Sequence, residues 1–298
     1  MNNLDVIVAV PLNCKLGEGL HWDAERNSFW FVDILNHLLY FYNLETLELK
    51  NRYFSEPICW AISIANSDKI LIGLKSGVAI FNFFEMKDDI HWINKTFPGK
   101  IDQRLNDAKI DKFGRLWFGS ISCVDESMPV GSLATLNIQK NNLEIIDTNY
   151  KVTNGPAFNY ENTLMLHNDS ANRITYIFQL DKQNGQVLNK SVWRTYTEEE
   201  GYPDGMNFDS DDNVWIAHWG VGKVCKYNIK GNLIQSISLP TPNVTNICFG
   251  GKDLNRLFVT TALNNFDNAD KISSSYDGAI FEIIGTNAKG LKNHSPNL

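Results

Sequence analysis

The sequence has a shortage of positive charge and no long hydrophobic run, and both absences narrow the range of functions. Its 298 residues include 27 Lys and Arg against 34 Asp and Glu, which gives a net charge of −7. Without a basic cluster the chain has little with which to neutralise a phosphate backbone, so we expect no nucleic-acid partner. The longest apolar runs have the length of a strand rather than the roughly 18 residues that cross a bilayer. We therefore expect no membrane partner.

Cysteine is also scarce, and its spacing argues against a structural role. The five cysteines are odd in number and lie far apart, at Cys14, Cys59, Cys123, Cys225 and Cys248. There is no C-x-x-C pair, so neither a disulfide framework nor a thiolate metal site is expected. The N-terminus lacks the positive segment and the apolar core of a secretory signal. We expect a cytoplasmic protein with reduced, mostly buried thiols.

In place of helical periodicity, the sequence repeats one strand-rich unit six times. Each unit has a turn cluster followed by a short run of β-branched and aromatic residues, and most units add a further run of this kind. The runs align on six anchor positions, which are Trp30, Leu71, Trp117, Met165, Trp215 and Phe258. Successive anchors lie about 40 to 50 residues apart, which is the period of four-stranded propeller blades rather than of helical repeats.

These repeats predict an all-β fold, a single six-bladed β-propeller domain over residues 1–298. The N-terminal segment 5–12, DVIVAVPL, has no repeat of its own. We expect it to supply the outermost strand of the last blade and so to close the ring, because closed arrangements of sheets leave few exposed edges. Residues 286–298 are expected to form a tail.

Four polar residues share one register, because each precedes its anchor by nearly the same number of positions. They are Glu18 in LGEGLHWD, Asn106 in RLNDAKID, Asn154 in TNGPAFN and Asp204 in YPDGMNFD. In a propeller, the segment that enters the innermost strand lines the mouth of the central channel. Neighbouring Gly, Pro and Asp residues allow tight turns that present a side chain inward. Four repeats are therefore predicted to bring polar oxygen atoms to one place.

Glu, Asn and Asp side chains supply the hard oxygen ligands that suit Ca²⁺, Mg²⁺ or Mn²⁺ better than a soft metal. A site with three protein ligands leaves coordination positions open for water or substrate, as a catalytic metal requires. We therefore predict a divalent metal site in the central channel. Arg104, two residues before Asn106, is suited to holding an oxygen-rich ligand through its forked donors.

At these residues the chain resembles the family of SMP-30 (regucalcin), gluconolactonase and luciferin-regenerating enzyme. The matching segments run in family order from about residue 17 to about residue 285, and they are GEGLHWDAERNSFWFVDI, RLNDAKIDKFGRLWFGS, NGPAFNYENTLMLHNDS, PDGMNFDSDDNVWIAHWG and ICFGGKDLNRLFVTTA. The resemblance implies a six-bladed propeller with one divalent cation in its channel and, for many members, hydrolysis of sugar lactones. Ca²⁺ is the first expectation for the cation, with Zn²⁺, Mn²⁺, Mg²⁺ and Fe²⁺ as alternatives.

The resemblance also implies roles for individual residues. Glu18, Asn154 and Asp204 match the metal ligands of the family, and Asp204 also matches the residue proposed as general base. Arg104 and Asn106 match residues that contact the substrate.

The chain departs from the family pattern at several positions. Ala108 stands where Gly is usual, Lys112 where Pro is common, and Ser120 and Ile121 where Thr-Met is frequent. The segment 122–129, interpreted as a lid loop, matches no particular substrate class. These departures leave the ligand set intact and the identity of the substrate open.

Three nearby polar residues receive structural interpretations. Asp107 is expected to bond the backbone of its turn, His167 to be a core histidine with satisfied nitrogens, and Asp169 to lie near the metal ligands as a supporting group.

The leading hypothesis is a metal-dependent hydrolase that opens an aldonolactone to the aldonic acid, as a monomer or weak homo-oligomer. A non-catalytic calcium-binding or interaction propeller, or a hydrolase of another ester, are the alternatives. The sequence leaves open whether Asp204 or the cation itself activates the attacking water.

Overall fold

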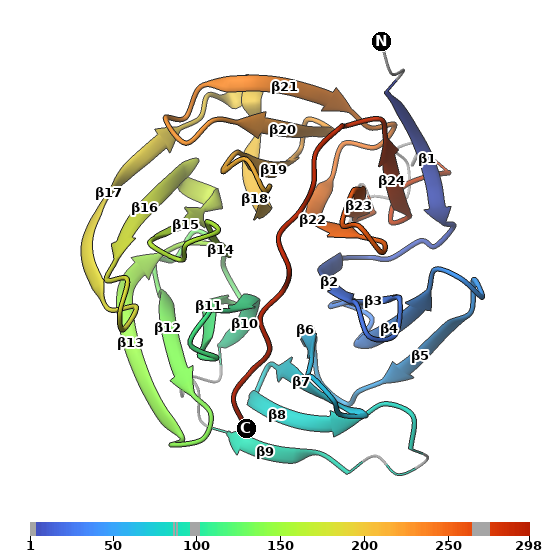
Figure 1. Cartoon of the computed structure of the whole chain (residues 1–298), viewed down its shortest axis with the longest axis vertical. Helices are drawn as coiled ribbons and strands as arrows, with labels where there is room; N and C mark the ends of the chain where they lie inside the picture. Colours follow the sequence, from blue (N-terminus) through green and yellow to red (C-terminus); the bar gives the residue numbers. More distant parts are fainter. Residues whose placement is uncertain (1–3, 86, 88, 96–101, 264–274) are drawn as a thin grey trace.

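The computed structural model describes residues 4–85, 87, 89–95, 102–263 and 275–298. In these residues, six four-stranded antiparallel sheets are arranged like blades around one axis (Figure 1). The prediction of an all-β six-bladed propeller is therefore confirmed. The parts of the predicted domain at residues 1–3, 86, 88, 96–101 and 264–274 lie outside the described residues.

The strands occupy equivalent places in the six blades. The innermost strands are β2 (Gly17–Asp23), β6 (Ile58–Ser63), β10 (Gln103–Ile110), β14 (Thr153–Phe158), β18 (Tyr202–Phe208) and β22 (Val244–Gly250). The second strands are β3 (Ser28–Asp33), β7 (Lys69–Leu74), β11 (Leu116–Ser122), β15 (Leu164–Asp169), β19 (Val214–Trp219) and β23 (Arg256–Thr261). The third strands are β4 (Leu38–Asn43), β8 (Gly77–Asn82), β12 (Gly131–Asn137), β16 (Ile174–Leu180), β20 (Lys223–Tyr227) and β24 (Ile280–Ile284). The outermost strands are β5 (Leu49–Tyr53), β9 (His91–Asn94), β13 (Asn142–Tyr150), β17 (Val187–Thr195), β21 (Leu233–Ser238) and β1 (Asp5–Val10).

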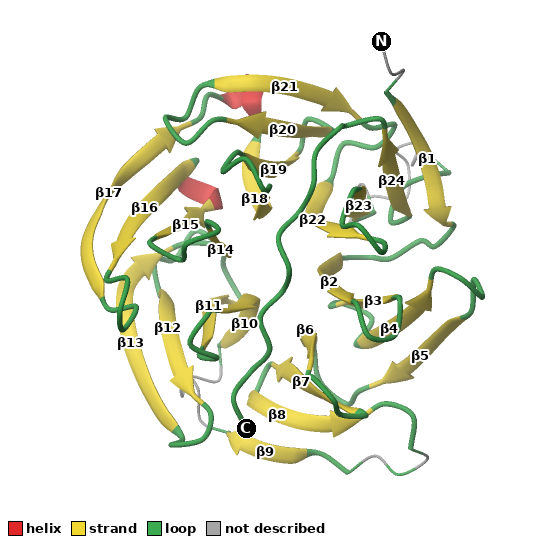
Figure 2. Ribbon diagram, viewed as in Figure 1, coloured by secondary structure: helices red, strands yellow, loops and turns green. Residues whose placement is uncertain are grey.

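The only helices in the described part of the chain are two short 3₁₀ turns, η1 (Ser170–Asn172) and η2 (Glu198–Glu200) (Figure 2). Within those residues, no helix has the length and apolar character needed to cross a membrane.

Burial explains why the second strands carry the strongest sequence signal. Each lies between its own sheet neighbours and is covered on both faces by adjoining blades, so it reads as a nearly continuous apolar run instead of alternating. All six residues of β3 are buried, for example. The six anchors are at most 1% exposed; they are Trp30, Leu71, Trp117, Met165, Trp215 and Phe258.

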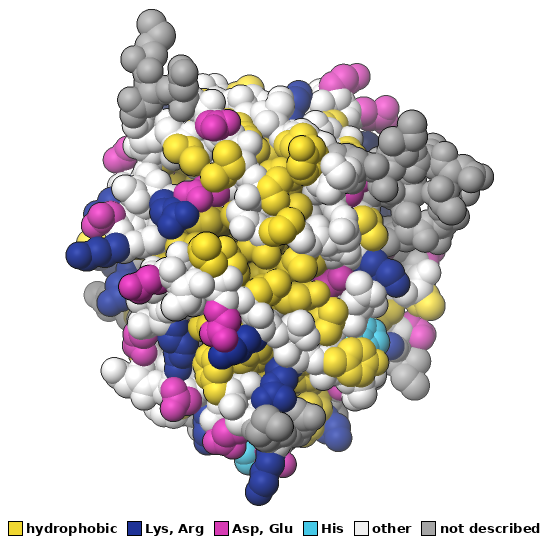
Figure 3. All heavy atoms as spheres, turned by 90° about the vertical axis from the view of Figure 1, so that its right-hand side faces the viewer, with side chains coloured by type: hydrophobic (Ala, Val, Ile, Leu, Met, Phe, Trp, Pro, Cys, Tyr) yellow, Lys and Arg dark blue, Asp and Glu magenta, His cyan; other side chains and the backbone are white. Residues whose placement is uncertain are grey.

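The ring closes by pairing the N-terminal strand with the C-terminal one. β1 is antiparallel to β24, with Asp5 opposite Ile284 and Val8 opposite Phe281, so the sixth sheet has the order β1-β24-β23-β22. On this side of the molecule, some apolar side chains of the outer strands reach the surface. Ile7 on β1 and Tyr53 on β5 are exposed, and the side view shows hydrophobic atoms among scattered charges (Figure 3).

Residues 285–298, which we name the C-terminal strap, cross one face of the propeller (Figure 1). The strap hydrogen-bonds to every blade, near the end of the innermost strand in the first blade and at the turn between the first two strands in the others. Its hydrogen-bond partners, from the first blade to the sixth, are Trp22, Ala65, Phe113, Asn162, Ser210 and Leu254. Since these turns follow the ends of the innermost strands, the strap covers the channel end opposite to the one where those strands begin.

A buried carboxylate ties the second strand to the innermost strand in alternate blades. The indole Nε1 of Trp30 donates to Asp23 at 3.1 Å, that of Trp117 to Asp111 at 2.8 Å, and that of Trp215 to Asp209 at 3.0 Å. Each carboxylate ends an innermost strand or follows it directly, so one side chain links the turn and the tryptophan. A tryptophan side chain can be buried this deeply when its N–H has such a partner.

We expect Asp111→Ala to lower the free energy of unfolding by about 3 kcal/mol, because it removes a buried charged acceptor. The substitution leaves the indole N–H of Trp117 without an acceptor. It also releases the Arg115 side chain, whose Nε donates to Asp111 at 2.8 Å. Urea unfolding followed by tryptophan fluorescence measures the loss. Asp253→Ala, in an exposed turn, is the matched control and should leave the midpoint unchanged. Equal effects of the two substitutions would contradict the proposed tie.

Candidate functional site

Each innermost strand contains an irregularity in its pairing with the second strand, close to where the strand begins. The register shifts between Glu18 and His21 in β2, between Leu105 and Ala108 in β10, and at equivalent places in the other four blades. Such bulges bend a strand and redirect its side chains, and they are common beside functional sites. All four residues of the shared register lie at a bulge. The bulge is thus the local device that brings them together.

Glycine makes two of these bulges possible. Gly19 has φ +60° and Gly155 has φ +80°, values in the left-handed region that side chains with a Cβ disfavour. Gly19 follows Glu18 and Gly155 follows Asn154. In both pairs the polar residue lies in the shared register, and the glycine adopts the backbone conformation that the bulge needs.

Three carboxylates converge at this end of the channel, on β2, β10 and β18. Glu18 and Asp204 are buried and Asp107 is half-buried. Burial raises the pKa of Glu18 to about 7, and the negative charge of Asp107 adds to the rise. Burial, followed by the charges of Glu18 and Asp107, raises the pKa of Asp204 well above its ordinary value. These mutual effects mean that negative charge is concentrated in a space with little water.

The amide of Asn246 on β22 links two of these carboxylates, and the sequence analysis missed it. Its Nδ2 donates to Glu18 Oε2 at 3.2 Å and lies 3.4 Å from Asp107 Oδ2. A signal was available, because Asn246 precedes its anchor Phe258 by as many residues as Glu18 precedes Trp30. No Gly, Pro or Asp stands beside Asn246 to mark it as a turn residue.

Asp107 bonds the backbone as expected and also belongs to the carboxylate group. It accepts from the backbone N–H of Ala108 at 2.7 Å and from that of Gly155, in the next blade, at 3.1 Å. Burial raises the pKa of Asp107, while the positive charge of Lys109 acts in the opposite direction. Asp107 therefore holds two blades together and contributes charge to the site.

A chain of hydrogen bonds connects the other predicted site residues. Arg104 Nη1 donates to Asn106 Oδ1 at 2.6 Å, and Asn106 Nδ2 donates to Asn154 Oδ1 at 2.8 Å. Asn154 Nδ2 in turn donates to the hydroxyl of Ser170 at 2.9 Å. This assignment leaves the Oδ1 atom of Asn154 with a free lone pair, since an amide oxygen can accept twice.

Asp204 has the one buried carboxylate oxygen of this group that lacks a donor. Its Oδ1 has no hydrogen-bond partner among the described residues, whereas its backbone oxygen accepts from Asn168 Nδ2 at 2.7 Å. A buried acceptor without a partner costs about 1–3 kcal/mol, and more when charged. The arrangement therefore favours a positively charged ligand beside Asp204.

The described residues contain no cluster of three or more His, Cys, Asp or Glu side chains arranged to hold a metal ion. A cation at this end of the channel would therefore need amide or backbone oxygen atoms as well as carboxylates. Asn154 is placed to provide one, through its hydrogen bond to Asn106.

His167 corrects one expectation from the sequence. The residue is fully buried, as predicted for a core position, but neither ring nitrogen has a hydrogen-bond partner among the described residues. Its ring packs edge-on against Tyr150 at 5.0 Å. Burial lowers the pKa of His167 to about 3, so the ring is neutral near pH 7. The histidine is thus a packed core group without satisfied nitrogens.

Asp169 serves its own turn. It accepts from the backbone N–H groups of Lys151 and Val152, at 3.2 Å each, and from Asn172 Nδ2 at 2.8 Å.

The segment 122–129 begins at the end of β11 and exposes Val124 and Met128. Its Glu126 is close enough to contribute, after burial and the two nearer carboxylates, to the raised pKa of Asp204.

The six-bladed fold, with carboxylate and amide side chains gathered at one end of its channel, agrees with the family resemblance of the sequence motifs. The chain matches the SMP-30/Gluconolactonase/LRE-like region over residues 16–263 and belongs to that family. The resemblance drawn from the motifs is therefore confirmed.

Individual relatives match over nearly their whole length. The putative sugar lactone lactonase YvrE of Bacillus subtilis is 29% identical over 280 residues, which are 93% of this chain and 94% of the relative. Human regucalcin is 25% identical over 302 aligned positions, covering 99% of each chain. The solved structure of a luciferin-regenerating enzyme superposes with a TM-score of 0.91 at 26% identity, covering 99% of this chain and 100% of that one.

The raised pKa of Glu18 predicts a specific pH dependence for metal-free protein. Its pKa rises from an ordinary 4.5 to about 7 on folding, so the unfolded chain releases this proton first. Between pH 4.5 and pH 7, Glu18 therefore lowers the free energy of unfolding by an amount that grows with pH. Below pH 4.5 the residue is protonated in both states, and this destabilisation disappears. Relative to wild type, Glu18→Gln should gain up to about 3 kcal/mol of unfolding free energy between pH 4.5 and pH 7.5.

Denaturant titrations of chelator-treated protein across this pH range measure the effect. Glu144→Gln, which changes an exposed glutamate of β13, is the control and should track wild type. A constant difference between wild type and Glu18→Gln at all pH values would show that Glu18 is not protonated on folding.

Proposed function

We propose that this protein is a divalent-metal-dependent hydrolase that opens a sugar-derived lactone, an aldonolactone, to the corresponding aldonic acid. The observation that carries the proposal is the bare, buried Oδ1 of Asp204 beside Glu18 and the Arg104–Asn106–Asn154 chain. Family membership and the name of the Bacillus subtilis relative support the substrate class. We further propose that its partner is a small lactone and that the protein is a cytoplasmic monomer or weak homo-oligomer.

Glu18, Asn154 and Asp204 are the proposed metal ligands. Two carboxylates and one amide oxygen form a hard donor set that fits Ca²⁺ best, with Zn²⁺, Mn²⁺, Mg²⁺ and Fe²⁺ as alternatives. The fit rests on the unpartnered oxygen of Asp204 and on the mutual repulsion of the carboxylates, which a cation would relieve. A bound divalent cation supplies Lewis-acid polarisation of the lactone carbonyl.

The chain's own residues bind the lactone and move the proton. Asp204 is the proposed general base, which takes a proton from the water that attacks the carbonyl carbon. Burial and the neighbouring negative charges raise the pKa of Asp204, which makes its carboxylate a stronger proton acceptor than an exposed one. The ring C–O bond then breaks, and Asp204 returns its proton to the leaving oxygen to form a hydroxyl. The carboxylic acid so formed loses its own proton to solvent and leaves as the carboxylate.

Arg104 and Asn106 are the proposed substrate contacts. Arg104 Nη1 is already engaged by Asn106 and by the backbone oxygen of Leu105. These bonds fix the plane of the guanidinium, so its other N–H groups present a rigid fork. Such a fork suits the hydroxyl and carbonyl oxygen atoms of a sugar lactone.

A hydrolysis screen tests the enzyme proposal. Chelator-treated protein is assayed with a pH indicator on aldono-1,4- and aldono-1,5-lactones, with Ca²⁺, Mn²⁺, Mg²⁺ or Zn²⁺ restored singly and spontaneous hydrolysis subtracted. We expect cation-dependent turnover of at least one lactone. Asp204→Asn should lower kcat/KM by roughly 10²–10⁴-fold, the contribution of a positioned base, while Asp253→Asn on the exposed turn should have no effect. Cation binding without acceleration of any lactone would refute the proposal in favour of a binding propeller.

Arg104→Lys separates substrate binding from proton transfer. Lysine keeps the positive charge and loses the fork, so we expect KM to rise about tenfold with a smaller change in kcat. Arg52→Lys, on the outer strand β5, is the control. An unchanged KM would remove Arg104 from the substrate site.

A further inference from the structure

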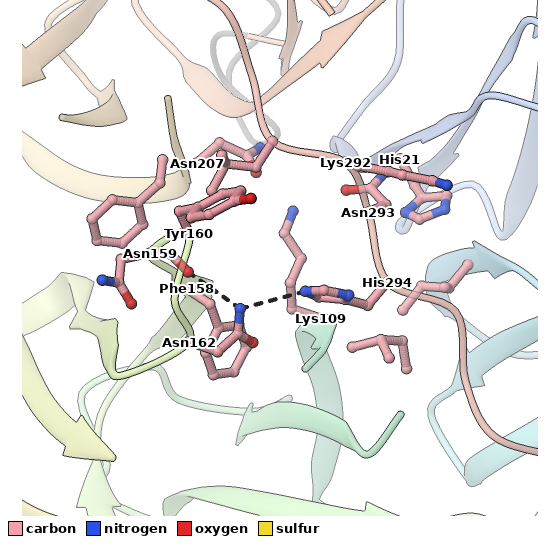
Figure 4. A pocket seen from close by; sticks show the side chains of 14 residues that line it. His21, Lys109, Phe158, Asn159, Tyr160, Asn162, Asn207, Lys292, Asn293 and His294 are labelled. Atoms are coloured by element: carbon pink, nitrogen blue, oxygen red, sulfur yellow. Dashed lines mark hydrogen bonds between the residues drawn. The ribbon is translucent and has the colours of Figure 1, made fainter. Parts of the chain in front are cut away.

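A second pocket lies at the opposite end of the channel from the carboxylates. It has a volume of about 150 Å³, which corresponds to about five water volumes. His21, Lys109 and Asn207 line it from the innermost strands, two or three residues beyond Glu18, Asp107 and Asp204. At about 3.3 Å per residue, the pocket begins 7–10 Å further along the channel. The C-terminal strap forms one wall with Leu291, Lys292, Asn293 and His294 (Figure 4).

The charge of this pocket is the reverse of that at the other end. Its described lining contains two lysines and two histidines and no Asp or Glu. The Lys109 side chain extends from β10 toward the middle of the pocket, between Tyr160 and the strap (Figure 4). Among the described residues, no carboxylate lies within ion-pair distance of Lys109 or of Lys292.

The two histidines of the pocket differ in what they offer a ligand, because His21 Nε2 already bonds the Ser63 hydroxyl at 2.9 Å. Burial, helped by the positive charge of Lys109, lowers the pKa of His21 to about 3. Burial also lowers the pKa of His294. His294 Nε2 lies 3.4 Å from the amide nitrogen of Asn162; as the acceptor of that N–H it leaves Nδ1 protonated and able to donate. The Asn207 Nδ2 donates one of its two N–H groups to the backbone oxygen of Ile247, which leaves the other for a ligand.

We propose that this pocket is a binding site for a small oxyanion of the size of inorganic phosphate. The Lys109 ammonium points into the pocket and has no carboxylate within ion-pair distance among the described residues, so it provides charge-assisted hydrogen bonds for such an anion. A cavity of about 150 Å³ has room for an anion of this size. The site is separate from the lactone site and does not depend on the proposed hydrolysis.

Histidine ring spectra locate the anion. The chain has six histidines, of which His21 and His294 line the pocket and His37 and His91 lie elsewhere. Inorganic phosphate is added to metal-free protein at pH 7 and constant ionic strength, and the ring ¹H–¹³C resonances are followed. We expect saturable shifts of His21 and His294, with His37 and His91 unmoved. Sulfate, an oxyanion of the same size, should produce saturable shifts of the same two resonances, whereas chloride should not.

Lysine variants provide the matched comparison. Lys109→Met should weaken phosphate binding at least tenfold, and Lys230→Met, at an exposed lysine far from the lining, should leave it unchanged. If Lys109→Met does not fold, Lys292→Met on the exposed strap replaces it and should weaken binding severalfold. Absence of a saturable shift in wild type, equal shifts with chloride, or undiminished binding in the pocket variant would each overturn the proposal.

Discussion

Repulsion among carboxylates at one end of the channel is the constraint on which the rest of the site depends. Glu18, Asp107 and Asp204 come from three different blades, and the ring brings them together irrespective of their charge. The neighbouring groups offset part of this repulsion, because Asn246 and the N–H of Gly155 donate to the carboxylates. Asp204 Oδ1 receives no such hydrogen bond, so the repulsion is not offset at this atom. A site under this strain gains more from a cation than a solvated group of carboxylates would.

The sequence predicted the blades well because the second strand of each blade is buried on both faces. An anchor such as Trp30 or Trp215 has no solvent-exposed neighbour on its strand. Each second strand is therefore a recognisable apolar run, and the spacing of these runs can be read from the sequence. The register of Glu18 was equally readable, since the glycines beside it report the bulge. Asn246 occupies the same register without a glycine, and its role emerges only when the blades are assembled.

The second pocket could not have been read from the sequence. Its walls combine strand residues such as Lys109 with His294 of the strap, which reaches them only after the ring has closed. Nothing local distinguishes Lys109 from any other lysine that alternates along a strand. Likewise the unsatisfied nitrogens of His167 depend on which groups the fold leaves beside it, whereas its burial followed from its apolar neighbours. Local patterns report burial, and contacts between distant segments decide the chemistry.

Charged side chains on the innermost strands interact electrostatically between the two ends of the channel. Lys109 is two residues from Asp107 on β10, and its positive charge opposes the rise in the aspartate's pKa. This lysine also repels a cation at the carboxylate end. An anion beside Lys109 would reduce that repulsion, while a cation beside Glu18 and Asp204 would reduce the repulsion of the anion. Charges of opposite sign in a space with little water attract one another over this separation more than they would in bulk solvent. The same strands that separate the two proposed sites therefore favour filling both.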